Sequence, residues 1–161
     1  MILGFSTFTW VHVIISLIGI VSGLIVLRGM LSSNRLDGWT AIFVAATALT
    51  GITGFGFPFE RLLPSHWTGI VSLAVLLVTV LARYAFRMRG AWRSAYVITA
   101  IVALWLNVFV LVAQLFNKIP ALRALAPTQS ESPFLIAQAA VLIVFVALAV
   151  AALRGFHPQA A

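Results

Sequence analysis

The chain has 161 residues, of which 63% are apolar and only 8% are charged, and its formal net charge is +7. Because a soluble domain carries about a quarter charged residues, this chain has too little polar surface to cover itself in water, and its composition is that of a membrane protein. It contains no cysteine, which excludes disulfide bonds and thiolate metal or redox sites.

Five long apolar runs follow one another along the chain, at 7–31, 39–57, 66–86, 95–116 and 134–153. Each is close to the ~20 residues that a helix needs to cross a hydrocarbon core about 30 Å thick. None alternates polar and apolar residues as a barrel strand does, so the runs predict helices. The sequence therefore predicts an all-α, polytopic membrane bundle of about five transmembrane helices, which forms a single domain over residues 1–161.

The first run is expected to be a retained span, because no basic residues precede it and no small-residue cleavage site follows it. The second run is the shortest and the most glycine-rich. The longest connection joins the last two runs, and its central part, residues 119–125, predicts one or two turns of helix that lie at the membrane interface.

The basic residues are distributed unequally between the two sides that five spans would define. The first connection, the third connection, the nearby run ends and the C-terminal tail together hold Arg28, Arg35, Arg83, Arg87, Arg89, Arg93 and Arg154. The other side holds only Arg61, Lys118 and Arg123. The positive-inside rule then predicts an external N-terminus and a cytoplasmic C-terminus.

These basic residues flank apolar runs, so we expect them to face lipid headgroups and not nucleic acid. Arg83, near the end of the third run, is expected to extend its side chain toward those headgroups. The strong charge bias, the small size and the lack of organelle-targeting signals predict a multi-pass protein of a bacterial inner membrane, with the lipid bilayer as its main partner.

Two histidines, His12 in the first run and His66 at the start of the third, would lie at similar depth in the outer leaflet. Gly19 and Gly23 share a helix face with His12, and Gly69 follows His66 by three residues. In these residues the chain resembles the four- and five-helix membrane b-type cytochromes. The resemblance implies one haem b, with His12 and His66 as its ligands and the glycines beside the macrocycle.

The same residues fit a second interpretation, in which they serve helix packing. Gly19 and Gly23 form a GxxxG motif, which lets two helices approach closely without any ligand. His12 would then hydrogen-bond a neighbouring helix, and His66 would lie in water at a helix start. Two histidines with Glu60 as the nearby carboxylate fall short of the three or four ligands of a zinc site, so no metal site is predicted.

Three amides lie inside predicted spans: Asn107, Gln114 and Gln138. Such amides usually form hydrogen bonds between helices, but they could instead line a polar cavity. The glycine- and phenylalanine-rich connection at 51–61 favours an ordinary turn over a quinone-contacting loop that would use Glu60 and His66.

No Asp, Glu or Lys lies well inside a span, and no catalytic or nucleotide-binding motif is present, so enzymatic activity is not predicted. Three functions remain. The favoured one is a structural or accessory role, as a homo-oligomer or as a small subunit of a membrane complex. The second is electron transfer by a haem bound to His12 and His66. The third is a channel or carrier for a neutral or lipophilic solute along Asn107 and Gln114.

Overall fold

The computed structural model describes residues 7–56 and 64–157, with the backbone alone at 64–66. All regular elements in these residues are helical. They are α1 (Thr7–Leu31), α2 (Asp37–Gly54), α3 (Pro64–Val80), the π-helical turn η1 (Leu81–Ala85), α4 (Ala91–Lys118), α5 (Pro120–Leu125) and α6 (Ser132–Gly155). The prediction of an all-α protein is therefore confirmed, and the interfacial stretch at 119–125 contains the short helix α5.

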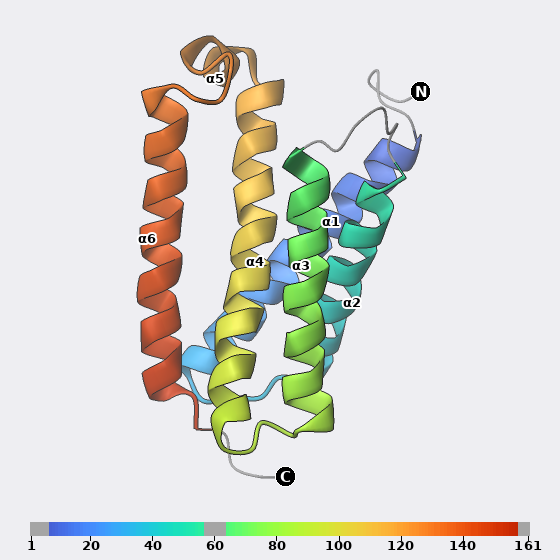
Figure 1. The fold of residues 1–161 in the computed structure, drawn as a ribbon, viewed down its shortest axis with the longest axis vertical. Coiled ribbons are helices and arrows are strands. Elements are labelled where there is room, and N and C mark those ends of the chain that lie inside the picture. The colour runs from blue at the N-terminus through green and yellow to red at the C-terminus, as the bar shows by residue number, and fades with distance from the viewer. Residues whose placement is uncertain (1–6, 57–63, 158–161) are drawn as a thin grey trace.

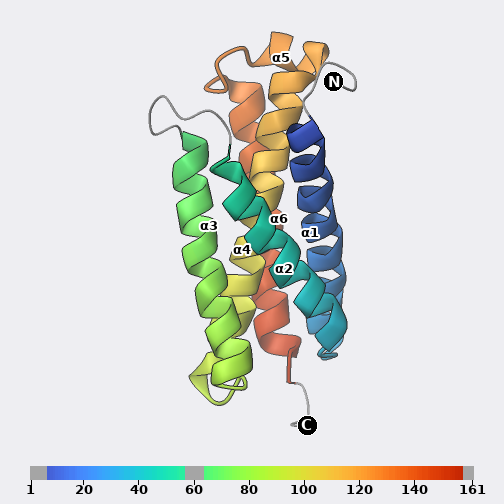
Figure 2. The same cartoon turned by 90° about the vertical axis from the view of Figure 1, so that its right-hand side faces the viewer.

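The five long helices run alternately up and down in one elongated bundle (Figure 1). One end carries the turn at 32–36, the turn at 86–90 and the residues that follow α6, and we call it the arginine-rich end. The opposite end carries α5 and the start of α1, and we call it the α5 end. Helix α2 packs against both α1 and α3 and lies between them (Figure 2).

Four helices are long and apolar enough to cross a membrane: α1, the segment Trp67–Ala85, α4 and α6. These correspond to four of the five predicted spans. The second predicted span is also a helix, α2, but it is not among the four, because its 18 residues include four threonines, three glycines and Asp37.

The core of the bundle is built around α4. Over residues 96–106 one face of α4 is buried, and the small side chains of Ala100 and Ala103 on this face let the neighbouring helices approach. Against it pack Val26 from α1, Phe43 from α2 and Leu76 from α3. Large apolar side chains point outward along the long helices, as on α6, where Ile143 is 68% exposed. In a bilayer these side chains face lipid, so their exposure costs nothing there.

At Gly23, α1 comes close to both α2 and α4. A Cβ atom added to Gly23 would lie 2.6 Å from Cδ1 of Leu104 and 2.9 Å from the ring of Phe43. Both side chains are buried in the core, so neither can move away freely. The close approach of α1 to α2 and α4 therefore requires a glycine here.

We expect Gly23→Ala to destabilise the bundle by about 1–3 kcal/mol, because an added methyl group overpacks a filled core. The matched control is Gly38→Ala in the first turn of α2, where an added Cβ would meet nothing within 4 Å. The control should be neutral or more stable by up to about 1 kcal/mol, since alanine favours helix. Thermal unfolding in detergent measures both, and equal midpoints for the two variants would contradict this description of the core.

Candidate functional site

His12 lies near the α5 end of α1 and bonds to α2. Its Nδ1 lies 2.7 Å from Oγ1 of Thr53. The Thr53 hydroxyl donates to the carbonyl of Leu49 at 2.7 Å, so its oxygen is left to accept a hydrogen from His12 Nδ1. This arrangement favours the tautomer with the proton on Nδ1, in which Nε2 carries the lone pair.

The second predicted haem ligand, His66, lies in the first turn of α3, and its side chain is outside the described residues. The pairing of the two imidazoles is therefore not tested. The predicted turn residue Glu60 also lies outside the described residues.

The three glycines that were assigned either to haem or to packing all lie against α2. An added Cβ at Gly19 would lie 3.4 Å from Oγ1 of Thr47, and one at Gly69 would lie 3.5 Å from the ring of Phe55. Gly23 meets Phe43 of α2 as well as Leu104. Because α2 occupies the space between α1 and α3, these contacts agree with the helix-packing interpretation of the glycines.

Two of the three amides join helices. Asn107 on α4 donates from Nδ2 to Oγ1 of Thr47 on α2 at 3.2 Å. Gln138 on α6 donates from Nε2 to the carbonyl of Phe109 on α4 at 3.0 Å. Bonds of this kind contribute about 0.6–2 kcal/mol each in a bilayer. Gln114 differs from them, because it lies exposed on the surface of α4.

The most concentrated polar cluster lies at the arginine-rich end, around Arg83 of η1. The Arg83 side chain is only 1% exposed, so the prediction that it reaches out to the headgroups is wrong. Its Nη2 donates to Oδ1 of Asp37 and to the carbonyl of Arg35, the latter at 3.0 Å. Its guanidinium carbon lies 5.0 Å from the ring centroid of Tyr96, within cation–π range. A buried charge of this kind is tolerated because a carboxylate and several dipoles compensate it.

A pattern in the sequence could have revealed this placement. Ser72, Leu76 and Thr79 are buried along one face of α3, and Arg83 follows Thr79 by four residues on that same face. The π-helical turn then ends the helix, as Phe86 N–H bonds the carbonyl of Leu81 at 2.9 Å. Continuing the buried face by one more turn would have placed Arg83 inside the bundle.

A second arginine at this end holds the chain that follows α6. Nη1 of Arg93 on α4 donates to the carbonyls of Leu153 at 3.1 Å and Phe156 at 2.6 Å. These carbonyls carry the partial negative charge of a helix C-terminus, which a cation neutralises. Phe156 is buried with its ring centroid 5.9 Å from that of Tyr96, and His157 N–H donates to Oγ of Ser33 at 2.9 Å.

The arginine-rich end is thus closed by polar and aromatic contacts among the turn at 32–36, α2, η1, α4 and the segment after α6. Its chemistry is that of a structural contact between helices, with the buried Arg83 cation, one carboxylate and the buried Tyr96. Among the side chains of residues 7–56 and 67–157, no three His, Asp or Glu groups come together in a way that could hold a metal ion.

Comparisons with known proteins do not assign the chain to a family. No protein-family model, no curated protein sequence and no solved structure matches it.

We expect Asp37→Asn to destabilise the protein by roughly 1–2 kcal/mol, because it leaves the buried Arg83 cation without its counter-charge while water replaces part of the loss. A double-mutant cycle with Arg83→Leu isolates the interaction, since Asp37→Asn should have little effect once the cation is gone. Chemical or thermal unfolding in detergent gives the four stabilities. The same loss in both backgrounds would show that the two side chains do not stabilise each other.

Proposed function

We propose that this chain is a structural or accessory protein of a bacterial inner membrane, which acts as a homo-oligomer or as a small subunit of a membrane complex. One observation carries the proposal: four polar side chains inside the long helices join neighbouring helices. His12, Asn107 and Gln138 each bond a neighbouring helix, and Thr79 of α3 donates to Thr99 of α4 at 2.9 Å.

This observation bears on the alternatives. A channel or carrier along Asn107 and Gln114 would need both amides to face a common path. Asn107 instead bonds Thr47, while Gln114 lies on the outer surface. The haem alternative stays a prediction, because it depends on the side chain of His66.

We further propose that α2 is the fifth span. Helix α1 ends at the arginine-rich end, whereas α3 begins at the opposite end, so the chain between them has to run from one end to the other. The 18 residues of α2 cover about 27 Å at 1.5 Å per residue, close to the ~30 Å of a hydrocarbon core. Its threonines are tolerated because Thr40 and Thr47 are buried against other helices.

The proposed orientation follows from the charges at the two ends. Arg28, Arg35, Arg83 and the other arginines of the predicted cytoplasmic set lie on segments that the fold gathers at the arginine-rich end. Lys118 and Arg123 lie at the α5 end. The positive-inside rule then supports a cytoplasmic arginine-rich end and an external α5 end.

We assign the partner contact to α6. Only 11% of its apolar stretch is buried, against 28%, 33% and 39% in the other three candidate spans. It packs mainly on α4 and touches α1 near the arginine-rich end, so most of its circumference is open to a second copy or another subunit. The exposed Ala147 and Ala151 on this helix would let a partner helix approach closely.

Cysteine labelling tests the topology, and the cysteine-free chain gives it a clean background. In intact bacterial cells, a membrane-impermeant maleimide should label Ser130→Cys and Glu60→Cys, but not Asn34→Cys. All three should react after the cells are opened. The same result for Asn34→Cys and Glu60→Cys, both labelled or both protected, would show that α2 does not cross, and labelling of Asn34→Cys alone would reverse the orientation.

Disulfide cross-linking tests the homo-oligomer. We expect Ala147→Cys on α6 to give a cross-linked dimer in membranes treated with a mild oxidant, because two copies would meet through this helix. Leu77→Cys on α3, where the native side chain is 58% exposed, is the matched control and should stay monomeric. Monomers for both variants on denaturing gels would exclude a dimer through α6.

A further inference from the structure

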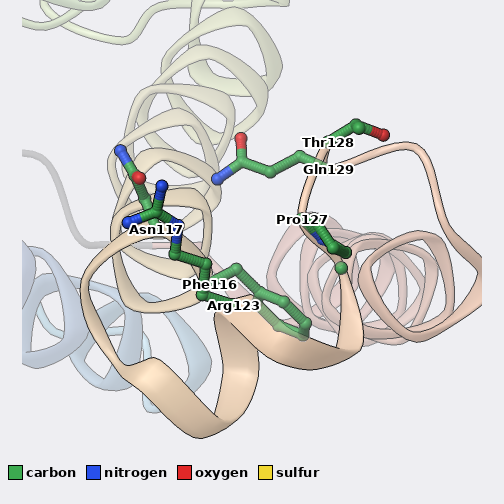
Figure 3. Close-up of a pocket in the computed structure, with 7 residues that line it drawn as sticks. Phe116, Asn117, Arg123, Pro127, Thr128 and Gln129 are labelled. Atoms are coloured by element: carbon green, nitrogen blue, oxygen red, sulfur yellow. The ribbon is translucent and has the colours of Figure 1, made fainter.

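A pocket of about 170 Å³ lies at the α5 end, where α4, α5 and the loop before α6 meet (Figure 3). Phe116 and Asn117 from the end of α4, Arg123 from α5 and Gln129 from the loop contribute to its lining. The volume is more than ten times the ~10–15 Å³ that a single water needs. The pocket can therefore admit a small chemical group and not only solvent.

The frame of the pocket is held by packing and by hydrogen bonds. Phe116 is buried and packs edge-on against Phe134 of α6, with ring centroids 5.4 Å apart. Gln129 donates from Nε2 to the carbonyl of Ala113 at 2.7 Å, which fixes the loop to α4. Ala126, at the turn after α5, is 1% exposed. The pocket is thus a consequence of how α5 folds back over the end of α4.

The electrostatics of the pocket favour an anion. Within the described residues Arg123 has neither an ion pair nor a side-chain hydrogen bond, and Figure 3 shows its guanidinium beside the amide of Asn117. The carboxylate that follows in the loop, Glu131, is bonded to its own loop, to the backbone N–H groups of Thr128 and Ser130 at 3.1 Å each. The C-terminal carbonyls of α4 carry about half a negative charge, which repels an anion. The guanidinium carries a full positive charge, so its attraction for an anion is the stronger of the two.

We propose that this pocket binds a phosphate group, with Arg123 as its ionic partner and Asn117 as a second donor. A guanidinium pairs with phosphate through two parallel hydrogen bonds, a geometry that suits a phosphate better than a spherical anion. The setting favours a phospholipid headgroup as the source. Ile119 and Leu125, on either side of Arg123 in the sequence, are 42% and 57% exposed, so they can lie among acyl chains while Arg123 lies at headgroup level.

The experiment uses the full chain in a mild non-ionic detergent and measures its thermal unfolding midpoint. The probes are dioleoyl phosphatidylglycerol, dioleoylglycerol as the phosphate-free lipid, and sodium phosphate. Because a ligand that binds only the folded state raises the midpoint in a saturable way, we expect phosphatidylglycerol to do so and dioleoylglycerol not to. Arg123→Gln should need roughly tenfold or more phosphatidylglycerol for the same shift, since a charge-assisted bond is lost.

Matched variants make the result specific. Arg89→Gln removes an exposed arginine at the opposite end and should respond as the unaltered chain does. Arg123→Lys keeps the charge but loses the fork-shaped donor set, so it should respond between the two and also covers a failure of Arg123→Gln to fold. A shift produced by sodium phosphate alone, and lost in Arg123→Gln, would support the phosphate site with a soluble ligand as its source. The proposal is overturned if Arg123→Gln responds like the unaltered chain, or if dioleoylglycerol produces the same shift.

Discussion

Lipid offers no hydrogen bonds, so polar groups in these helices need partners within the bundle itself. The hydroxyl groups meet this need first within their own helix. Ser22, Thr50 and Thr99, for example, each donate to the carbonyl four residues earlier. A hydroxyl oxygen that has donated its hydrogen can still accept one, and this second capacity joins the helices. Thr53 can accept from His12 in this way, and Thr99 accepts from Thr79.

This requirement explains the position of α2 in the bundle. A helix with four threonines and three glycines would be poorly suited to a lipid-facing position. Between α1 and α3 its Gly51 lets Leu73 of α3 approach closely, and its hydroxyls meet donors from both α1 and α4. The long helix that is not among the four most apolar segments thus lies between α1 and α3.

The sequence alone predicts the helices well. A bilayer leaves the backbone few alternatives to a helix, and long apolar runs indicate the segments that are suited to cross it. It predicts the partners of polar side chains less well. The position of Asn107 indicates a bond between helices, but only the fold shows that the acceptor is Thr47. The prediction for Arg83 was wrong because an arginine near the end of a span usually extends its side chain toward water. The turn at 32–36, which brings Asp37 to it, depends on contacts far apart in the sequence. The glycines allowed two interpretations, since close packing and a flat cofactor both need small side chains.

The two ends of the molecule differ in how their arginine side chains are bonded. At the arginine-rich end, the side chains of Arg83 and Arg93 are bonded within the bundle, and the chain after α6 is fastened to α4 and to the turn at 32–36. At the α5 end a guanidinium remains without a protein partner in the described residues, and a pocket stays open beside it. The arginine-rich end is therefore held together by bonds within the protein, whereas the α5 end leaves a cation accessible to a ligand.

The attachment of α6 also sets an order of events during biosynthesis. Arg93 donates hydrogen bonds to the carbonyls of Leu153 and Phe156, which lie about sixty residues further along the chain. A ribosome makes these residues after Arg93, so Arg93 can form these bonds only once α6 has been made. Helices α1 to α4 can therefore pack together before the chain after α6 is fastened to Arg93.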